Sequence, residues 1–330
     1  MTSKIFPLTL GKLILSSNVI YSSLAGCSDY PFRRIVVPYR PGLFFCEMVK
    51  MDALVHYEKE TFRFLDYSAE MHPIGAQLCG CNASLAAAAA RIIEDLGFNV
   101  IDFNCGCPVD KITKDGCGSA MLKHPEAIGE ILANMIAAVR IPVTVKVRAG
   151  WDANTIKAPL ITRIAEEAGA AAITVHGRTR KQGYRGESDW NHIKTCKEAA
   201  HCIKVIGNGG VYDAPSGLAM FEKTGCDGIL VSRGTLGQPW IAEDIYRLDK
   251  GGKIQKRSIE DCRKELLKHF EEMCRYYAPS RVVINMRRIG CWYFKGAERT
   301  RVFRREIARA ASVEAIRNLI MNFSFEGEDV

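Results

Sequence analysis

The chain reads VIDFNCGCP from Val100 to Pro108, and this stretch contains the pattern on which the predicted fold is built. Its first four residues form a short, largely apolar run with the length of a buried strand. Gly106 then allows a tight turn, and Pro108 fixes the direction of the outgoing chain. The stretch predicts a strand whose end presents the thiol of Cys107 to a cleft, although close cysteines also occur in cores and as metal ligands.

The same pattern recurs along most of the chain. Eight short apolar runs are each followed by Gly, Asn or Cys, and they lie at residues 19–25, 43–48, 74–78, 100–103, 143–147, 172–175, 204–206 and 228–231. Helix-like segments separate them at residues 84–96, 125–139, 158–167, 190–199 and 214–223. Such alternation predicts an α/β fold with a parallel sheet, and eight repeats match a closed (β/α)8 or TIM barrel. An open doubly wound sheet is the alternative, but residues 26–29 read GCSD, which is not the glycine-rich turn typical of that fold.

The alternation stops after residue 240. Gly251 and Gly252 lie in a charged stretch typical of a linker, and helical spacing of apolar residues follows at 260–277, 282–294 and 312–323. The sequence therefore predicts two domains. Residues 1–248 form the barrel, and residues 249–330 form a small helical domain.

Charge and cysteine content narrow the class of protein. The 330 residues carry a net charge of +8, and residues 247–330 hold 19 basic against 12 acidic side chains. This bias favours an anionic partner. Thirteen cysteines without a secretory leader predict a reduced, cytoplasmic protein, and the absence of a window of ~20 uncharged apolar residues predicts no membrane span.

Polar side chains cluster where the predicted strands end, which is where TIM barrels carry their active sites. Gln77, Asn104, Lys146 and His176 occupy these positions, and a lysine inside a barrel strand calls for an anion or a charged partner. The glycine-rich segments 207–210 and 232–234 follow the last two strands, the usual place for a phosphate. A flat heterocycle with a phosphate tail, such as flavin mononucleotide (FMN), fits this set.

Over nearly its whole length the chain resembles the tRNA-dihydrouridine synthases, and most closely the bacterial B-type. The motifs that carry the resemblance are LAGCSDYPFR (24–33), CEMV (46–49), IGAQL (74–78), NCGCP (104–108), GCGSAML (116–122), VKVR (145–148), HGRTR (176–180), GNGG (207–210) and SRGTLGQPW (232–240). In the C-terminal part the motif is WY-x-KG (292–296). The resemblance implies a barrel that binds FMN tightly, takes hydride from NADPH and reduces the C5–C6 bond of a uridine in tRNA.

The resemblance also assigns roles to residues. It makes Cys107 the acid that protonates C5 and leaves Cys105 without a role. The implied FMN contacts are Ser23, Leu24, Ala25, Gln77, Lys146, His176, Asn208, Gly209, Gly210, Ser232 and Arg233. Ser23, Gly210 and Ser232 depart from the family's usual Pro, acidic residue and Gly, but these contacts are largely made by the backbone in the family.

Contacts with tRNA are expected in two regions. Residues 281–309 place nine basic against two acidic side chains, with aromatics among them, and a basic loop follows the sixth strand. Together with the strand ends, these regions give the expected substrate residues Asn104, Arg148, Arg178, Arg180, Tyr184, Arg287, Arg288 and Lys295. No obligate protein partner is evident, and a monomer is expected.

Three other functions remain open at this point. An FMN barrel that reduces a small enone or a dihydroorotate-like molecule would explain the barrel but not the basic helical extension. A metal protein would use Cys79, Cys81, Cys105 and Cys107, although C-x-C is an uncommon zinc spacing. An RNA-binding protein without enzymatic activity would contain no flavin. The sequence does not indicate which uridine is reduced, or whether NADPH is preferred to NADH.

Overall fold

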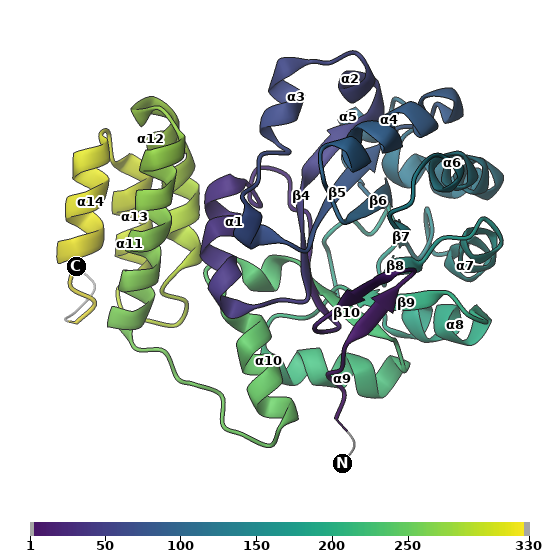
Figure 1. Cartoon of the computed structure of the whole chain (residues 1–330). Helices are drawn as coiled ribbons and strands as arrows, with labels where there is room; N and C mark the ends of the chain where they lie inside the picture. Colours follow the sequence, from purple (N-terminus) through teal and green to yellow (C-terminus); the bar gives the residue numbers. More distant parts are fainter. Residues whose placement is uncertain (1–2, 327–330) are drawn as a thin grey trace.

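The computed structural model describes residues 3–326, and its centre is a closed barrel of eight parallel strands (Figure 1). Sequential strands are neighbours, and the last strand pairs with the first to close the barrel. The strands are β3 (Val19–Tyr21), β4 (Leu43–Lys50), β5 (Ile74–Cys79), β6 (Val100–Cys105), β7 (Val143–Arg148), β8 (Ala172–His176), β9 (Lys204–Asn208) and β10 (Gly228–Val231). All eight predicted strands and the predicted TIM-barrel class are confirmed.

Helices cover the outside of the barrel (Figure 1). They are α1 (Tyr30–Val36), α2 (Met51–Val55), α3 (Lys59–Arg63), α4 (Ala83–Asp95), α5 (Asp110–Thr113), α6 (Pro125–Ala138), α7 (Ala158–Glu167), α8 (Asn191–Ala199), α9 (Ala214–Thr224) and α10 (Ile241–Asp249). In α4, Ala86, Ala89, Ala90 and Ile93 are buried. Their spacing of three and four residues forms one apolar face toward the strands.

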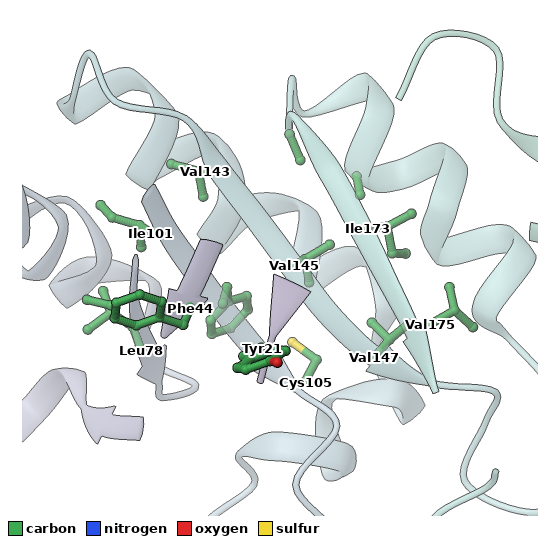
Figure 2. Close-up of a cluster of buried hydrophobic side chains, with 14 of the residues drawn as sticks. Tyr21, Phe44, Leu78, Ile101, Cys105, Val143, Val145, Val147, Ile173 and Val175 are labelled. Atoms are coloured by element: carbon green, nitrogen blue, oxygen red, sulfur yellow. The ribbon is translucent and has the colours of Figure 1, made fainter. Parts of the chain in front are cut away.

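Each barrel strand presents alternate residues to two different environments. On β6 and β7, Ile101, Phe103, Cys105 and the valines 143, 145 and 147 belong to the large core between strands and helices (Figure 2). The intervening residues, such as Asp102, Asn104 and Lys146, face the barrel interior, because successive side chains of a strand point to opposite faces. The alternation thus separates an apolar outer wall from an interior that becomes polar toward the carboxyl ends of the strands.

A short hairpin closes the amino-terminal end of the barrel. Its strands β1 (Leu8–Leu10) and β2 (Leu13–Leu15) pair antiparallel, with Leu8 opposite Leu15. The leucines pack with residues near the beginnings of the barrel strands, including Leu43 and Val100. This hairpin was not predicted, because three-residue strands give too little pattern. Among residues 3–326, no helix is both long and apolar enough to cross a membrane.

Four further helices form a unit with its own apolar core, drawn in green and yellow in Figure 1. They are α11 (Ile259–Tyr276), α12 (Pro279–Ile289), α13 (Thr300–Arg309) and α14 (Val313–Asn322). The α-helix expected over 282–294 ends at Ile289 and continues as a 3-10 helix over Gly290–Trp292, so the expectation was wrong only for its last two residues. Gly290 keeps helical backbone angles, and a Cβ atom there would lie 2.1 Å from Ile307 Cδ1, so the chain approaches α13 closely at this position.

Candidate active site

The carboxyl ends of the strands bring most of the expected site residues together. Gln77 on β5, Asn104 on β6, Lys146 on β7 and His176 on β8 are residues of adjacent strands and follow the inward-facing alternation. They come from four separate parts of the sequence. The closed parallel barrel is what makes them neighbours.

A buried carboxylate organises this end of the barrel. Asp102 is 3% exposed and accepts hydrogen bonds from Thr144 Oγ1 at 2.7 Å and from Gln77 Nε2 at 2.6 Å. Asn104 Nδ2 in turn donates to Gln77 Oε1 at 2.8 Å. Burial raises the pKa of Asp102, while the hydrogen bonds from Gln77 and Thr144 oppose that rise. Sequence reasoning missed Asp102, although a lone acid inside an apolar run is itself a signal of a buried polar contact.

The turn that carries Cys107 is held on both sides. Asn104 Oδ1 accepts from the backbone N–H groups of Gly106 at 3.1 Å and Cys107 at 2.9 Å. Arg148 Nε donates to the carbonyl oxygen of Gly106 at 2.9 Å. Cys107 is half-buried at the barrel mouth, whereas Cys105 is fully buried in the outer core (Figure 2). The two neighbouring thiols therefore lie in different environments.

The mouth of the barrel is strongly cationic. Burial, and then the charge of Arg148, lowers the pKa of Lys146 to about 8. Burial also lowers the pKa of Arg148 to about 10 and that of His176 well below its usual value. His176 is therefore neutral at pH 7, and its Nδ1 accepts from the N–H of Arg178 at 3.3 Å, which leaves the proton on Nε2. Such a site favours an anionic ligand.

Two consecutive glycines after β9 form a cradle. Gly209 and Gly210 have φ values of +98° and +84°, which ordinary residues rarely adopt. A Cβ atom on Gly209 would lie 2.6 Å from Ser188 Oγ and 2.9 Å from His176 Nε2. Within residues 3–326, no hydrogen bond engages the backbone N–H of either glycine. Free N–H groups in this backbone conformation are typical of an anion-binding nest.

The cradle continues to the next strand and to a larger cavity. Asn208 Nδ2 donates to the carbonyl oxygen of Leu230 at 2.7 Å and to Ser232 Oγ at 3.0 Å, joining β9 to β10. A small cavity lies between His176, Gly209, Gly210, Ser232 and Arg233. It shares Gly210, Tyr212 and Arg233 with a cavity of about 810 Å³ that is also lined by Arg178, Tyr184, Trp190 and Lys223.

The residues expected after β3 and β8 border the same mouth. Ser23 is the second residue of the β3–α1 loop. Its Oγ atom is buried and has no hydrogen-bond partner within the described residues. Tyr184 is 60% exposed and lies beside two guanidinium groups, at 5.6 Å from Arg148 and 5.1 Å from Arg233. Arg180, on the same loop, pairs at 2.5 Å with Asp110, which follows Cys107 by three residues.

The basic residues expected in the helical unit divide into two groups. Lys295 Nζ donates to the carbonyl oxygen of Leu236, just beyond β10, at 2.9 Å. Arg288 donates to the carbonyl oxygen of Gly26, in the β3–α1 loop. Arg287 points the other way and donates to Ala310 within the helical unit. Arg288 and Lys295 thus reach the barrel mouth, and Arg287 does not.

The metal hypothesis finds no support in the arrangement of ligand types. Among residues 3–326, no group of three or more His, Cys, Asp and Glu side chains is arranged to hold a metal ion. Cys81 donates instead to the carbonyl oxygen of Asp115 at 3.2 Å.

Two solved structures share the barrel fold. One is described as "Crystal structure of TcOYE with pHBA"; it has a TM-score of 0.59 and 11% identity, and the match covers 78% of this chain and 96% of that one. The other is histamine dehydrogenase from Rhizobium sp. 4-9, with a TM-score of 0.54, 12% identity and coverage of 81% and 50%. At such low identity the likeness concerns the fold alone.

Comparison of amino-acid sequences gives information beyond the fold. The family model "Dihydrouridine synthase (Dus)" matches residues 21–324. A "Probable tRNA-dihydrouridine synthase" of Rickettsia bellii is 35% identical over 95% of this chain and 97% of its own length. The "tRNA-dihydrouridine synthase B" of Pasteurella multocida is 34% identical over 89% of both chains. Both the barrel and the C-terminal helices lie within these matches, and the chain therefore belongs to the dihydrouridine synthase family.

Proposed function

We propose that this protein is an oxidoreductase that reduces uridine to 5,6-dihydrouridine in tRNA, with FMN as bound cofactor and NADPH as reductant. The observation that carries the proposal is the pairing of a fixed, half-buried thiol, Cys107, with an anion-binding nest at Gly209–Gly210 in one cationic barrel mouth. Family membership and the names of the relatives support the same substrate.

The residues at the mouth fit FMN. The nest at Gly209 and Gly210 offers free N–H groups to a phosphate, and Ser23 offers a buried hydroxyl without a partner. We assign the cofactor to Ser23, Leu24, Ala25, Gln77, Lys146, His176, Asn208, Gly209, Gly210, Ser232 and Arg233. When bound, FMN supplies a hydride for C6 of the uridine.

The proposed role of Cys107 is to deliver a proton from Sγ to C5 of the uridine. A general acid has to be held within hydrogen-bond reach of the atom that it protonates. Asn104 and Arg148 meet this need by fixing the peptide groups on both sides of Gly106. Arg148 remains charged at pH 7, so it also favours an electron-rich uracil oxygen.

Recognition of tRNA is assigned to the edge of the mouth and to the helical unit. A uridine has to leave its stack to reach the barrel, at a cost of a few kcal/mol that phosphate contacts offset. We propose that residues 1–248 perform the chemistry and residues 249–330 bind tRNA. Lys295 and Arg288 lie where the two parts meet, and Arg178, Arg180 and Tyr184 border the mouth on the opposite loop.

The cellular setting follows from the cysteines and from the substrate. All 13 cysteines are free thiols, which is typical of a reducing compartment. We therefore propose a cytoplasmic location, where tRNA and NAD(P)H are both available.

The test uses purified protein, its absorption spectrum and unmodified tRNA transcripts. We expect a flavin spectrum, oxidation of NADPH that depends on tRNA, and dihydrouridine in the product by mass spectrometry. Binding of tRNA should weaken steeply with salt, which a small-molecule oxidoreductase would not show. A protein without flavin, or one that turns over free uracil or enones but not tRNA, would refute the proposal.

A further inference from the structure

A buried acid on β4 has no place in the mechanism above. Glu47 is 5% exposed and lies where the pairing of β4 with β5 changes register: Phe45 pairs with Gly75, but Met48 pairs with Gln77. One extra residue of β4 is accommodated there, which is a β-bulge. Bulges next to active sites typically redirect a side chain, and Glu47 is in the bulged segment.

Glu47 is directed to the loop between β3 and α1. Its Oε1 accepts a hydrogen bond from the backbone N–H of Gly26. The carbonyl oxygen of the same residue accepts from Arg288 on α12. Gly26 is therefore held by the barrel on its N–H side and by the helical unit on its carbonyl side. Its φ is +70°, and a Cβ atom there would lie 2.9 Å from Arg288 Nη1, so a larger residue does not fit without a shift.

Gly26 lies at the centre of a compact turn that includes expected flavin contacts. The N–H of Leu24 donates to Ser28 Oγ at 2.8 Å. The carbonyl oxygen of Leu24 accepts from Cys27 at 2.8 Å and from Ser28 at 2.9 Å. Because these bonds close the turn, a displacement of Gly26 also displaces Leu24 and its neighbour Ala25.

We propose that Glu47 is a positioning residue for the flavin: together with Arg288 it clamps Gly26 and so holds the segment Ser23–Ala25 in place. The inference rests on the proposed function, because it assumes that this segment contacts FMN. Glu47 touches neither flavin nor uridine in this account. It acts through Gly26, and Arg288 belongs to the clamp as well as to the basic surface.

The charges around Glu47 make the clamp sensitive to pH. The titratable and charged groups around it are Asp29 at the start of α1, Arg33 on α1, Cys27 in the loop, Cys46 on β4, Tyr277 after α11 and Arg288 on α12. Burial and the charge of Asp29 raise the pKa of Glu47 to about 7, against the opposing effects of Gly26, Arg33 and Arg288. Asp29 is itself held by the hydroxyl of Tyr277 at 3.1 Å.

Protonation of Glu47 weakens it as an acceptor, since hydrogen bonds to a charged group are the stronger ones. The clamp is therefore expected to loosen as the pH falls through about 7. A glutamine at this position keeps the acceptor oxygen but cannot titrate.

The first test measures the FMN dissociation constant of flavin-stripped protein between pH 6 and 8.5, by quenching of flavin fluorescence. We expect Glu47→Ala to weaken FMN binding at least tenfold at pH 8. We expect the ratio of wild-type to Glu47→Gln affinity to fall severalfold from pH 8 to pH 6. Titration of the FMN phosphate is common to both proteins and cancels in this ratio. An Ala variant within twofold of wild type, or superimposable pH profiles, would overturn the inference.

The second test compares two neighbouring arginines without tRNA. Arg288→Met and Arg287→Met each remove one cation from α12, but only Arg288 contacts Gly26. We expect FMN binding to weaken at least threefold in Arg288→Met and to stay within experimental error in Arg287→Met. Equal losses of FMN affinity in the two variants would refute the clamp. If Glu47→Ala does not fold, this pair of variants alone tests the inference.

Different results would refute the proposed function and the clamp. Wild-type protein that neither binds FMN nor forms dihydrouridine refutes the proposed function. Wild-type protein that does both, with FMN binding unaffected in the Glu47 and Arg288 variants, refutes the clamp alone.

Discussion

At the amino-terminal ends of the strands, the barrel is filled by Leu8, Leu10 and Leu15 of the hairpin together with apolar strand residues. At the carboxyl ends, the same strands carry Asp102, Lys146 and other buried polar groups whose pKa values are displaced. Burial of apolar side chains at the amino-terminal end stabilises the folded protein. Desolvation of charged groups at the carboxyl end destabilises it. The comparison indicates that stability and chemistry are allotted to opposite ends, as is usual for TIM barrels.

The largest effect is expected from substitution of Cys107 at the carboxyl end, and it should change only the rate of the reaction. Cys107→Ala should lower the rate of dihydrouridine formation by about 10²–10⁴, the usual contribution of a general acid. FMN binding and the unfolding free energy should stay close to wild type. Single-turnover oxidation of NADPH-reduced enzyme by tRNA measures the rate.

The matched control for this experiment is Cys105→Ala, which removes a thiol of the outer core two residues away. It should retain most of the activity and lose some stability. A Cys107→Ala variant that forms dihydrouridine at a near-normal rate would show that the thiol is not the proton donor.

The amino-terminal end should respond in the opposite way. Leu43→Ala removes a side chain that is 1% exposed in the hairpin cluster and should lower the unfolding free energy by about 3 kcal/mol. The rate per folded molecule at 25 °C should not change. Urea unfolding and activity of the same preparation test both points, and a loss of activity without a loss of stability would contradict the separation of the two ends.

Lys146→Met should make the flavin-free protein more stable, by about 1–2 kcal/mol at pH 7. The pKa of Lys146 is lowered from 10.5 to about 8, so below pH 8 the folded protein carries a costly charge. The stability advantage of Lys146→Met over wild type should therefore shrink as the pH increases from 8 to 10.5. Buried cysteines such as Cys46 and Cys226, whose raised pKa values act on stability in the opposite direction, are common to both proteins and cancel in this difference. FMN affinity should fall.

Urea unfolding at pH 7 and pH 9.5 provides the measurement for Lys146. If the variant were less stable than wild type at pH 7, the charge would be a net contributor to folding, and the contrast between the two ends would be lost.

The smallest effect is expected from the nest. Gly209→Ala forces a residue with a side chain into φ near +98° and should cost about 1–2 kcal/mol of stability. The added methyl group also meets Ser188 and His176, so FMN affinity should fall. Gly225→Ala is the control, because Gly225 also has positive φ (+66°) but has no atom within 4 Å of its would-be Cβ.

Isothermal titration with FMN separates the two glycine variants. Both should be destabilised, and only Gly209→Ala should bind FMN more weakly. A similar loss of affinity in Gly225→Ala would mean that backbone strain, and not the shape of the nest, governs binding.

The sequence predicted the barrel well because buried parallel strands are continuous apolar runs that stand out from their surroundings. It also predicted which residues follow each strand, and so which side chains meet at the mouth. Asp102 was not predicted as a site residue because it was counted as part of an apolar run. The role of the hairpin was not predicted for a different reason, since the function of Leu8 and Leu15 depends on the barrel end that they fill.

Interactions between distant segments were the part that sequence could not supply. The contact of Arg288 with Gly26 joins residues far apart in the chain, and no local pattern encodes it. The bulge that directs Glu47 depends on register between two strands, which alternation alone does not determine. The roles assigned to individual site residues remain predictions.

The chain of amides that starts at Asp102 has a fixed sense of direction. Both oxygens of the Asp102 carboxyl group accept hydrogen bonds, from Gln77 and Thr144, so Gln77 turns its NH₂ group toward Asp102 and its oxygen toward Asn104. Asn104 then has to turn its own oxygen toward the backbone of Cys107. The backbone N–H groups of Gly106 and Cys107 can only donate, so they require the same orientation of Asn104 from the other end of the chain. The acid at the base of the mouth and the thiol loop at its rim thus fix the orientation of two amides that are chemically almost symmetric.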